Sequence, residues 1–326
     1  MNSPLPSKNV HSPLSGRNLG SLVVFSLASG IALSWLILLV MMPMLTTPFQ
    51  LGDIYGNLPF SLDWPYLVNL FFQLLITVLI LFAVCHNGLE LVNKAASGEV
   101  NHEEGPKVRR WDLNQRIQHI VLFVTMVFLA VTGFAQLYFE GWGRIVIDAM
   151  GGLAISMDIH LLAAFILGVL VVYHFAFYGM QYLYQRARGL PAPLPINIGL
   201  KDVTDALQNM KHLVGLGADE PRYGKYNYAE KFDYWGIYWG TIILSAPGVI
   251  MWAYGINVLD GLPFIFHTDE AMLAVLFLLI FHFFQAHWNP RDFPMNKVFL
   301  TGTMSEEDMR TTHPRELERI KAEGEN

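Results

Sequence analysis

The sequence has few charged residues for its length. Only 15% of its 326 residues are Asp, Glu, Lys or Arg, whereas a typical soluble domain has about a quarter. The formal net charge is -6, so the chain lacks the basic excess with which proteins bind a nucleic-acid backbone. This composition argues against a water-soluble enzyme and against a nucleic-acid-binding protein.

Cysteine is almost absent, since Cys85 is the single one. One thiol cannot form a disulfide framework, hold a cysteine-ligated iron–sulfur cluster or provide the Cys-x-x-Cys-His attachment of a c-type haem. Apolar residues instead make up 53% of the chain, and the mean hydropathy is +0.37. The chain also has 11 histidines, and their positions carry most of the functional information.

Six apolar stretches are long enough to cross a bilayer, which takes about 20 residues. They cover roughly residues 22–45, 65–86, 117–139, 158–184, 234–254 and 268–288. The first is too long for the core of a signal peptide and has no small-residue cleavage site, so we expect it to be retained. The predicted fold is an all-α membrane protein with six transmembrane helices.

Lysine and arginine are divided unevenly between the connections. Of the 21, 20 lie in the N-terminal segment, the connections 87–116 and 185–233, and the tail, whereas the three connections on the other side hold only Arg144. Basic connections stay in the cytoplasm. We therefore expect a bacterial or archaeal inner-membrane protein with both termini in the cytoplasm.

The predicted spans divide the chain into three parts. Residues 1–106 form an N-terminal extension with two accessory transmembrane helices and a charged linker. Residues 107–290 form a four-helix core, and 291–326 form a polar cytoplasmic tail that is helix-prone toward its end. The connection 188–227 is expected to hold one short amphipathic helix along the inner surface.

The core shows a faint internal duplication. Arg116, His119 and Gly133 correspond to Lys231, Tyr234 and Gly248 at one offset of about 115 residues along the chain. This pattern favours two similar helical hairpins.

Histidines recur at two depths in the core spans. They are His119, His160, His174, His267, His282 and His287. An ionisable side chain within a membrane is costly and is functional by default. Since 14 helical residues rise about 21 Å, the second core span carries histidines at both ends, and the fourth has nearly the same spacing.

Imidazoles on opposing helices suit a flat macrocycle with two axial ligands, so haem b is the predicted cofactor. Zinc and non-haem iron sites usually add carboxylates or a His-Glu-x-x-His spacing, which these spans lack. Gly133, Gly168 and Gly248 lie mid-span, where a haem face needs close backbone approach. Glycine also simply lets membrane helices pack closely.

Several short motifs together resemble a known family. They are Arg116-Ile-Gln-His119, Thr132-Gly133, Asp158-Ile-His160, Lys225-Tyr-Asn227, His267-Thr-Asp-Glu-Ala and Phe281-His-Phe-Phe-Gln-Ala-His287. Over about residues 107–315 the chain resembles the cytochrome b561-like gamma subunits of respiratory formate dehydrogenases. The first hundred residues have no counterpart in the smallest members of that family.

This resemblance implies a four-helix bundle that binds two b haems and carries electrons between a quinone and a redox partner. Carried over to this chain, the outer haem would use His160 and His267, and the inner haem His119 and His282. His174 and His287 depart from the family pattern. They could replace a ligand, line the quinone pocket or serve a third haem.

The family's quinone pocket lies at the inner haem, beside an asparagine that corresponds to Asn227. Asn227 could equally cap the helix that follows it. Arg116 could neutralise a haem propionate, or it could be an ordinary interface anchor. Menaquinone or ubiquinone is the expected substrate, and no further catalytic residue is expected.

The favoured function is the cytochrome b subunit of a respiratory complex. Its expected partners are an iron–sulfur or multihaem cytochrome subunit and a dehydrogenase or reductase catalytic subunit. The alternatives are a stand-alone transmembrane b561-type reductase and a non-redox anchor or transporter. A transporter is disfavoured because the histidines lie toward the span ends and midplane carboxylates are absent.

The remaining histidines carry no functional prediction. His86 ends an accessory span without an apparent partner, and His11, His102, His212 and His313 are expected to be ordinary loop residues.

Overall fold

The structure, a computed structural model, describes residues 64–97, 105–290, 292–293 and 295–324. The predicted first span, residues 22–45, lies outside the described residues, as do His11 and His102. The count of six transmembrane helices therefore stays a prediction.

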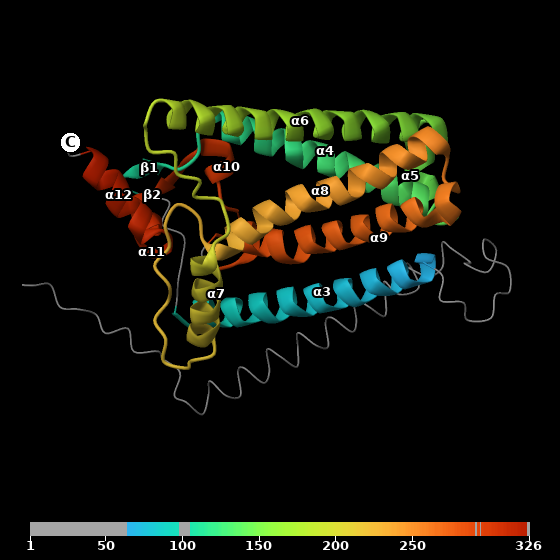
Figure 1. Cartoon of the computed structure of the whole chain (residues 1–326). Helices are drawn as coiled ribbons and strands as arrows, with labels where there is room; N and C mark the ends of the chain where they lie inside the picture. The colour runs from blue at the N-terminus through green and yellow to red at the C-terminus, as the bar shows by residue number, and fades with distance from the viewer. Residues whose placement is uncertain (1–63, 98–104, 291, 294, 325–326) are drawn as a thin grey trace, which may run out of the picture.

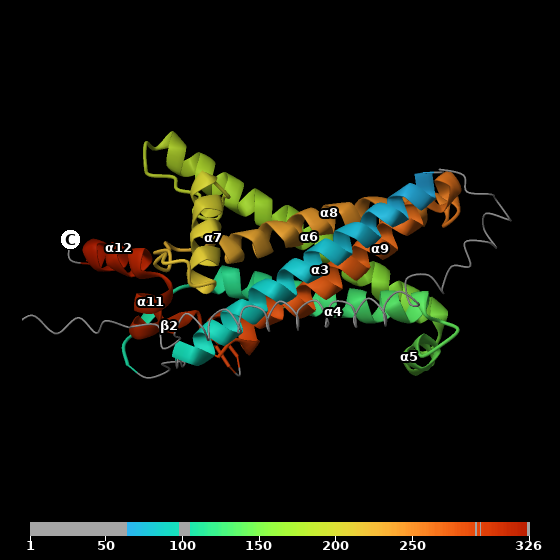
Figure 2. The same ribbon diagram turned by 90° about the horizontal axis from the view of Figure 1, so that it is seen from below.

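Five helices of the described residues are long and apolar enough to cross a membrane. They are α3 (Trp64–Ser97), α4 (Leu113–Leu137), α6 (Leu153–Ala187), α8 (Tyr228–Tyr254), and α9 (Leu262–Phe277) with its π-helical continuation η2 (Leu278–His282) and η3 (Phe284–Trp288). Their long axes run in roughly one direction in Figure 1, whereas Figure 2 shows that α6 crosses α3 and α9. These helices correspond to the second to sixth predicted spans.

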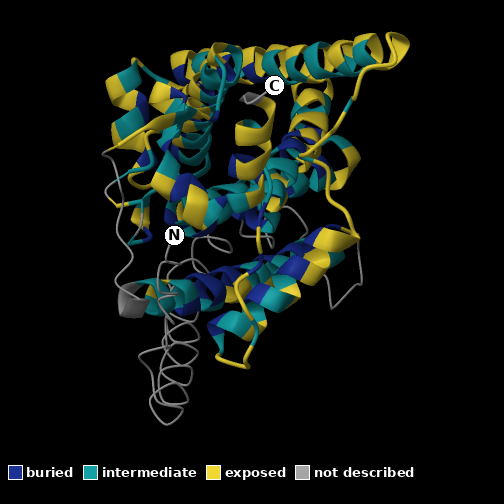
Figure 3. Cartoon of the chain, turned by 90° about the vertical axis from the view of Figure 1, so that its left-hand side faces the viewer, coloured by how far each residue is buried: buried dark blue, intermediate teal, exposed yellow. Residues whose placement is uncertain are grey.

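Apolar side chains lie on the outer faces of these helices as well as at the interfaces between them. Leu162 of α6 and Trp239 of α8, for example, are each 60% exposed. Figure 3 shows exposed positions spread over the outer faces and buried ones where helices meet. Exposed apolar surface on this scale fits contact with lipid rather than with water.

Helix α3 packs directly on α9, although the sequence indicated only an accessory span. Their shared core contains buried aliphatic side chains of both helices: Ile76, Ile80, Val84, Met272, Leu273 and Leu276. Burying this apolar surface joins the N-terminal extension to the predicted core.

Every described span begins before its predicted start, by six residues for both α8 and α9. Helix α3 continues past residue 86 to Ser97, because Glu90 and Lys94 form an ion pair of 3.2 Å on successive turns. Helix α9 begins at Leu262 rather than at 268, with Pro263 in its first turn, where a proline is favourable. Asp269 and Glu270 lie buried two and three residues after His267, toward the outer end of this helix, so the expected absence of midplane carboxylates stays a prediction.

Capping boxes fix the starts of α4 and α8. Asp112 and Gln115 bond each other's backbone amides at the start of α4, and Asn227 and Glu230 do the same at the start of α8. Each box satisfies two backbone N–H groups that a helix start leaves unpaired. The capping role considered for Asn227 is confirmed.

Shorter elements cover both ends of the long helices (Figure 1). One end, here called the inner end, carries α7 (Leu200–Leu213), β1 (Lys107–Arg109), α10 (Val298–Thr301), β2 (Thr303–Ser305), α11 (Glu306–Thr312) and α12 (Pro314–Gly324). The opposite, outer end carries α5 (Gly143–Met150) and η1 (Val258–Gly261). The short helix expected within 188–227 and the helical end of the tail are confirmed.

The all-α prediction misses a small sheet. Strands β1 and β2 pair in antiparallel register, with Lys107 opposite Ser305. The pairing joins the segment before α4 to the tail. Three-residue strands have no periodicity of their own, so only the folded chain could bring them together.

His313 was expected to be an ordinary loop residue, and this expectation is wrong. It is 3% exposed, and its Nε2 lies 3.1 Å from Oε2 of Glu230 and 3.2 Å from Nη2 of Arg110. Arg110 in turn lies 3.7 Å from Oε1 of Glu230. This triad fastens the tail to the segment before α4 and to the first turn of α8.

We predict that His313→Leu loosens the tail, since it leaves Arg110 and Glu230 without their imidazole partner. The loss should be about 1–3 kcal/mol of local stability. It would be measured as faster proteolysis within residues 295–324 of the purified full chain.

Glu318→Gln is the matched control, because it breaks only an exposed ion pair with Arg222 and should change little. Equal cleavage rates in the two variants would contradict the role of the triad.

Candidate functional site: two histidine pairs in one cavity

The outer pair is His160 of α6 and His267 of α9, whose ring centroids are 6.2 Å apart. Nδ1 of His267 donates to the carbonyl oxygen of Leu244 at 2.8 Å. Nδ1 of His160 lies 2.8 Å from Oγ1 of Thr132. That hydroxyl donates to the Phe128 carbonyl at 2.6 Å, so it accepts from the ring. In each histidine Nε2 therefore keeps the lone pair that a metal requires.

Two mid-span glycines make room for these rings. A Cβ atom at Gly133 would lie 3.2 Å from Cε1 of His160. A Cβ atom at Gly248 would lie 3.2 Å from Cε1 and 3.3 Å from Nδ1 of His267. Both distances are tighter than ordinary van der Waals contact. The glycines at the predicted offset thus play the same part on α4 and α8: each allows one imidazole of the outer pair to approach the helix backbone.

The inner pair is His119 of α4 and His282 of η2, with ring centroids 6.3 Å apart. Nδ1 of His282 donates to Oδ2 of Asp233 on α8 at 2.5 Å. The rings of Trp111 and Phe299 each lie 5.3 Å from that of His119. Nδ1 of His119 is buried and has no hydrogen-bond partner among the described residues.

Both pairs fit an iron porphyrin with two axial imidazoles. Such rings have centroids about 6 Å apart, because each metal–nitrogen bond is about 2 Å long and each nitrogen lies about 1 Å from its ring centre. All four histidines line one cavity of about 2750 Å³. That volume is well above the roughly 1,000 Å³ of a large small-molecule site, so there is room for more than one large group.

The donor set does not suit a bare metal ion. Over the described ranges, no group of three or more His, Cys, Asp or Glu side chains is arranged to hold one. Two imidazoles alone leave a free ion undercoordinated, whereas a porphyrin supplies four further nitrogen ligands.

A sequence model of the family described as prokaryotic cytochrome b561 matches residues 22–191, more than half of the chain. The chain belongs to this family. It is therefore a membrane b-type cytochrome, and its long apolar helices make it a multi-pass prokaryotic membrane protein. The family binds b-type haem. A search of curated proteins finds no match.

The family match includes the N-terminal extension of the cytochrome. It begins within the predicted first span and ends just after α6, and thus covers His119, His160 and His174 but not His267 or His282. The contact between α3 and α9 links the matched part to the helix that supplies the other member of each pair.

His174 and His287 lie in different surroundings from the paired histidines. Both nitrogens of His174 have partners, since Nδ1 lies 2.7 Å from Oε1 of Gln118 and Nε2 lies 2.6 Å from the hydroxyl of Tyr234. The ring of His287 packs beside those of Phe283 and Phe299. This placement does not support the possibility that these residues replace a haem ligand. It also does not support a third haem.

Arg116 and Asn227 have structural partners at the inner end. Nη2 of Arg116 donates to the Leu300 carbonyl of the tail, while its Nε is buried without a partner among the described atoms. The amide oxygen of Asn227 accepts from the backbone of Glu230 at 2.8 Å, and the residue also lines the cavity. The roles predicted for these two residues toward haem and quinone stay predictions.

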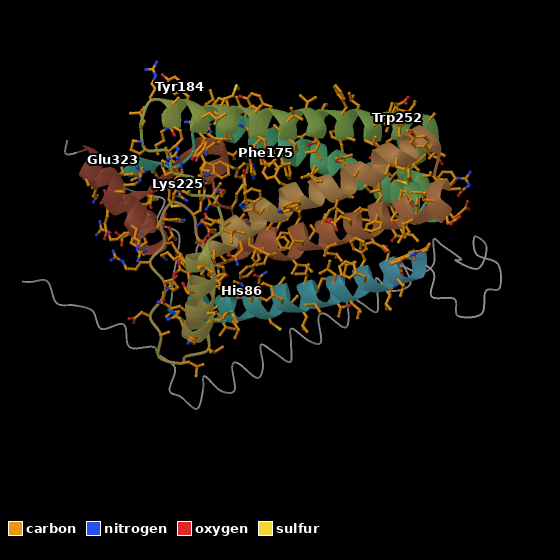
Figure 4. The ribbon with its side chains drawn as sticks, viewed as in Figure 1. His86, Phe175, Tyr184, Lys225, Trp252 and Glu323 are labelled. Carbon is orange, nitrogen blue, oxygen red and sulfur yellow. The ribbon has the colours of Figure 1, made fainter. Side chains whose placement is uncertain are left out.

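Charged and phenolic groups gather where the cavity reaches the inner end, near Lys225 (Figure 4). Burial lowers the pKa of the Lys225 amino group and raises the pKa of Tyr226 to about 12. Burial also opposes ionisation of Glu316, but hydrogen bonds and charge from Arg319 outweigh it and lower the pKa of that carboxyl. Glu316 is therefore ionised at neutral pH, whereas Tyr226 keeps its proton.

Sequence reasoning missed the partners of the histidines, namely Thr132, Leu244 and Asp233. Asp233 carried a usable signal, because an acidic residue at the edge of an apolar span is unusual for the same reason as a histidine. Leu244 acts through its backbone carbonyl, so its side chain gives no signal.

We predict that Gly248→Ala disturbs the outer pair, because the added methyl group must displace His267 by a few tenths of an ångström. Overpacking of this kind costs about 1–3 kcal/mol. The expected result is a shifted low-spin haem signal, or a partial loss of haem. Haem content and low-temperature absorption spectra of the purified protein provide the measurement.

Gly236→Ala on the same helix is the matched control, since its Cβ would lie 3.8 Å from the nearest atom, in Phe277. If Gly236→Ala and Gly248→Ala gave the same spectra, the contact with His267 would have no consequence for the site.

We predict that Asp233→Asn raises the midpoint potential of haem bound between His119 and His282. A carboxylate bonded to Nδ1 makes an imidazole ligand more electron-rich, which favours oxidised iron. Loss of the charge should change the equilibrium constant between oxidised and reduced haem iron about tenfold, which corresponds to about 59 mV for one electron. Spectroelectrochemical titration of the bound haem measures the shift. An unchanged potential, or an equal shift of every haem signal in the titration, would show that Asp233 does not act through His282.

Proposed function

We propose that this cytochrome is the membrane subunit of a quinone-linked respiratory complex, similar to the gamma subunit of formate dehydrogenase. The single observation that carries the proposal is the presence of two histidine pairs, at two depths, within one cavity. His267 and His282 lie 15 positions apart on α9 and its continuation η2, and the helical rise over that length separates the two pairs by about 20 Å.

In this proposal His160 and His267 hold the outer haem, and His119 and His282 hold the inner one. Haem b supplies a one-electron carrier at each position when it is bound. The residues of the chain provide the rest: Thr132 and Leu244 keep Nε2 of the outer imidazoles free for iron, and Asp233 orients His282. The surrounding apolar helices exclude water.

A quinone would exchange electrons near the inner pair, and a partner redox subunit near the outer pair. The inner end carries α7, the sheet and the tail helices, and the connections rich in Lys and Arg meet there (Figure 1). By the distribution of these charges the inner end faces the cytoplasm. The protons of the quinone would then exchange with the cytoplasm through the titratable groups around Lys225 and Glu316.

A stand-alone b561-type reductase would share both histidine pairs, and the family fits it equally well. Purification of the cytochrome from its native membrane under mild conditions separates the two functions. A respiratory subunit should bring with it stoichiometric iron–sulfur or multihaem subunits and a dehydrogenase or reductase. A stand-alone reductase should purify alone and reduce an outside acceptor.

We predict that His160→Ala loses one of two haems and leaves the other reducible by quinol. The purified wild-type chain should show a Soret band and split α-bands after reduction with dithionite, and the variant about half of that haem with one α-band. His212→Ala is the control, because this histidine bonds only a loop carbonyl, that of Ala218.

Full haem content in His160→Ala would contradict the proposed pairing. A colourless wild-type chain that takes up no haem would contradict the proposed function as a whole.

A further inference from the structure

A second polar site lies beside the inner pair, between α4, α6 and α8. It consists of Gln118, His174 and Tyr234, all of which line the cavity. The three side chains form one chain of hydrogen bonds, with 2.7 Å between Gln118 and His174 and 2.6 Å between His174 and Tyr234. Each side chain comes from a different helix.

The direction of these hydrogen bonds follows from chemistry. An amide oxygen can only accept, so Nδ1 of His174 carries the proton and donates to Oε1 of Gln118. Nε2 of the neutral ring is then an acceptor, and the Tyr234 hydroxyl donates to it. The ring therefore holds the amide group of Gln118 in one orientation.

The Gln118 amide at one end of this series of hydrogen bonds has a donor group without an acceptor. Gln118 is only 7% exposed, and its Nε2 is buried without a hydrogen-bond partner among the described residues. Leaving a buried N–H unpaired is unfavourable. An acceptor on a bound molecule would pair this N–H group, and the cavity that Gln118 lines provides the space.

The surroundings of the three residues are aromatic and uncharged. The rings of Tyr238 and Tyr178 lie 4.7 and 4.8 Å from that of His174, and the ring of Phe175 lies 5.5 Å away. Figure 4 shows Phe175 between α6 and α8. These contacts suit a flat neutral ring that bears a carbonyl oxygen, rather than a carboxylate, which would call for a cation.

On both α4 and α8, a residue of this site is next in sequence to a residue of the inner pair or to its hydrogen-bond partner. Gln118 precedes His119 on α4, and Tyr234 follows Asp233, which is bonded to His282, on α8. Asn227 lies seven residues before Tyr234 on α8, about 10 Å along the axis, and its amide oxygen is already used by the helix cap.

We propose that the head group of the quinone binds at Gln118, with its carbonyl oxygen accepting from Nε2 of Gln118. His174 and Tyr234 are positioning residues that hold this amide in place. The inference rests on the proposed function and locates its substrate. It assigns to His174 a role other than that of haem ligand.

The test uses the purified full chain with bound haem and two probes, a short-chain naphthoquinone and a short-chain benzoquinone. Equilibrium dialysis measures binding of the oxidised probe. The concentration dependence of haem reduction by the corresponding quinol gives the KM. The variant is Gln118→Met, which keeps the length of the side chain and removes the amide. The control is Gln136→Met on the same helix, whose amide donates to Ser156.

We expect Gln118→Met to weaken binding of at least one probe about tenfold, with haem content and midpoint potentials unchanged. Gln136→Met should bind as wild type does. Tyr234→Phe, which removes one hydroxyl group and tests the same chain of hydrogen bonds, should weaken binding by a smaller factor. It serves as the second variant if Gln118→Met does not fold.

Three results would overturn the inference. Unchanged affinity in Gln118→Met and Tyr234→Phe, together with a loss in Asn227→Ala, would place the head group at the start of α8. A changed haem spectrum in Gln118→Met with unchanged quinone binding would show that the amide bonds a haem propionate. A wild-type chain that contains haem but neither binds quinone nor is reduced by quinol would refute the proposed function as well.

Discussion

The arrangement of this cytochrome depends on how imidazole side chains are satisfied inside a membrane. A neutral imidazole has one donor and one acceptor nitrogen, and the lipid offers no water to pair with either. For His160, His267 and His282 the protein pairs Nδ1, through Thr132, Leu244 and Asp233. Each of these rings is thereby held, and its Nε2 keeps the lone pair.

Helix α8 contacts histidines of both pairs, although it provides no paired histidine itself. It carries Asp233, Leu244 and Gly248, which contact histidines of both pairs. Its start is fixed by the Asn227–Glu230 capping box, and Glu230 also contacts His313 of the tail. The tail thus contacts the helix that orients the imidazoles. The outer pair has neutral partners and the inner pair a carboxylate, so the two sites differ in electrostatics although their centroid distances are nearly equal.

Helix α3, the described helix of the N-terminal extension, is part of the same folded unit. Helix α3 buries aliphatic side chains against α9, and its His86, labelled in Figure 4, lies 2.8 Å from the hydroxyl of Tyr228 at the start of α8. Asn69 of α3 donates to the buried Asp269 of α9 at 3.0 Å, which gives that carboxylate a partner within the span.

The sequence by itself determined the five described spans, the cap at Asn227, and the histidines that the resemblance pairs, because apolar length, capping residues and helical rise are local properties. It did not determine the partner of His282, which is 49 residues away, the sheet that joins 107–109 to 303–305, or the burial of His313. These depend on how far each helix is rotated and shifted against its neighbours. That is decided by the packing of all the helices together, and no single segment encodes it.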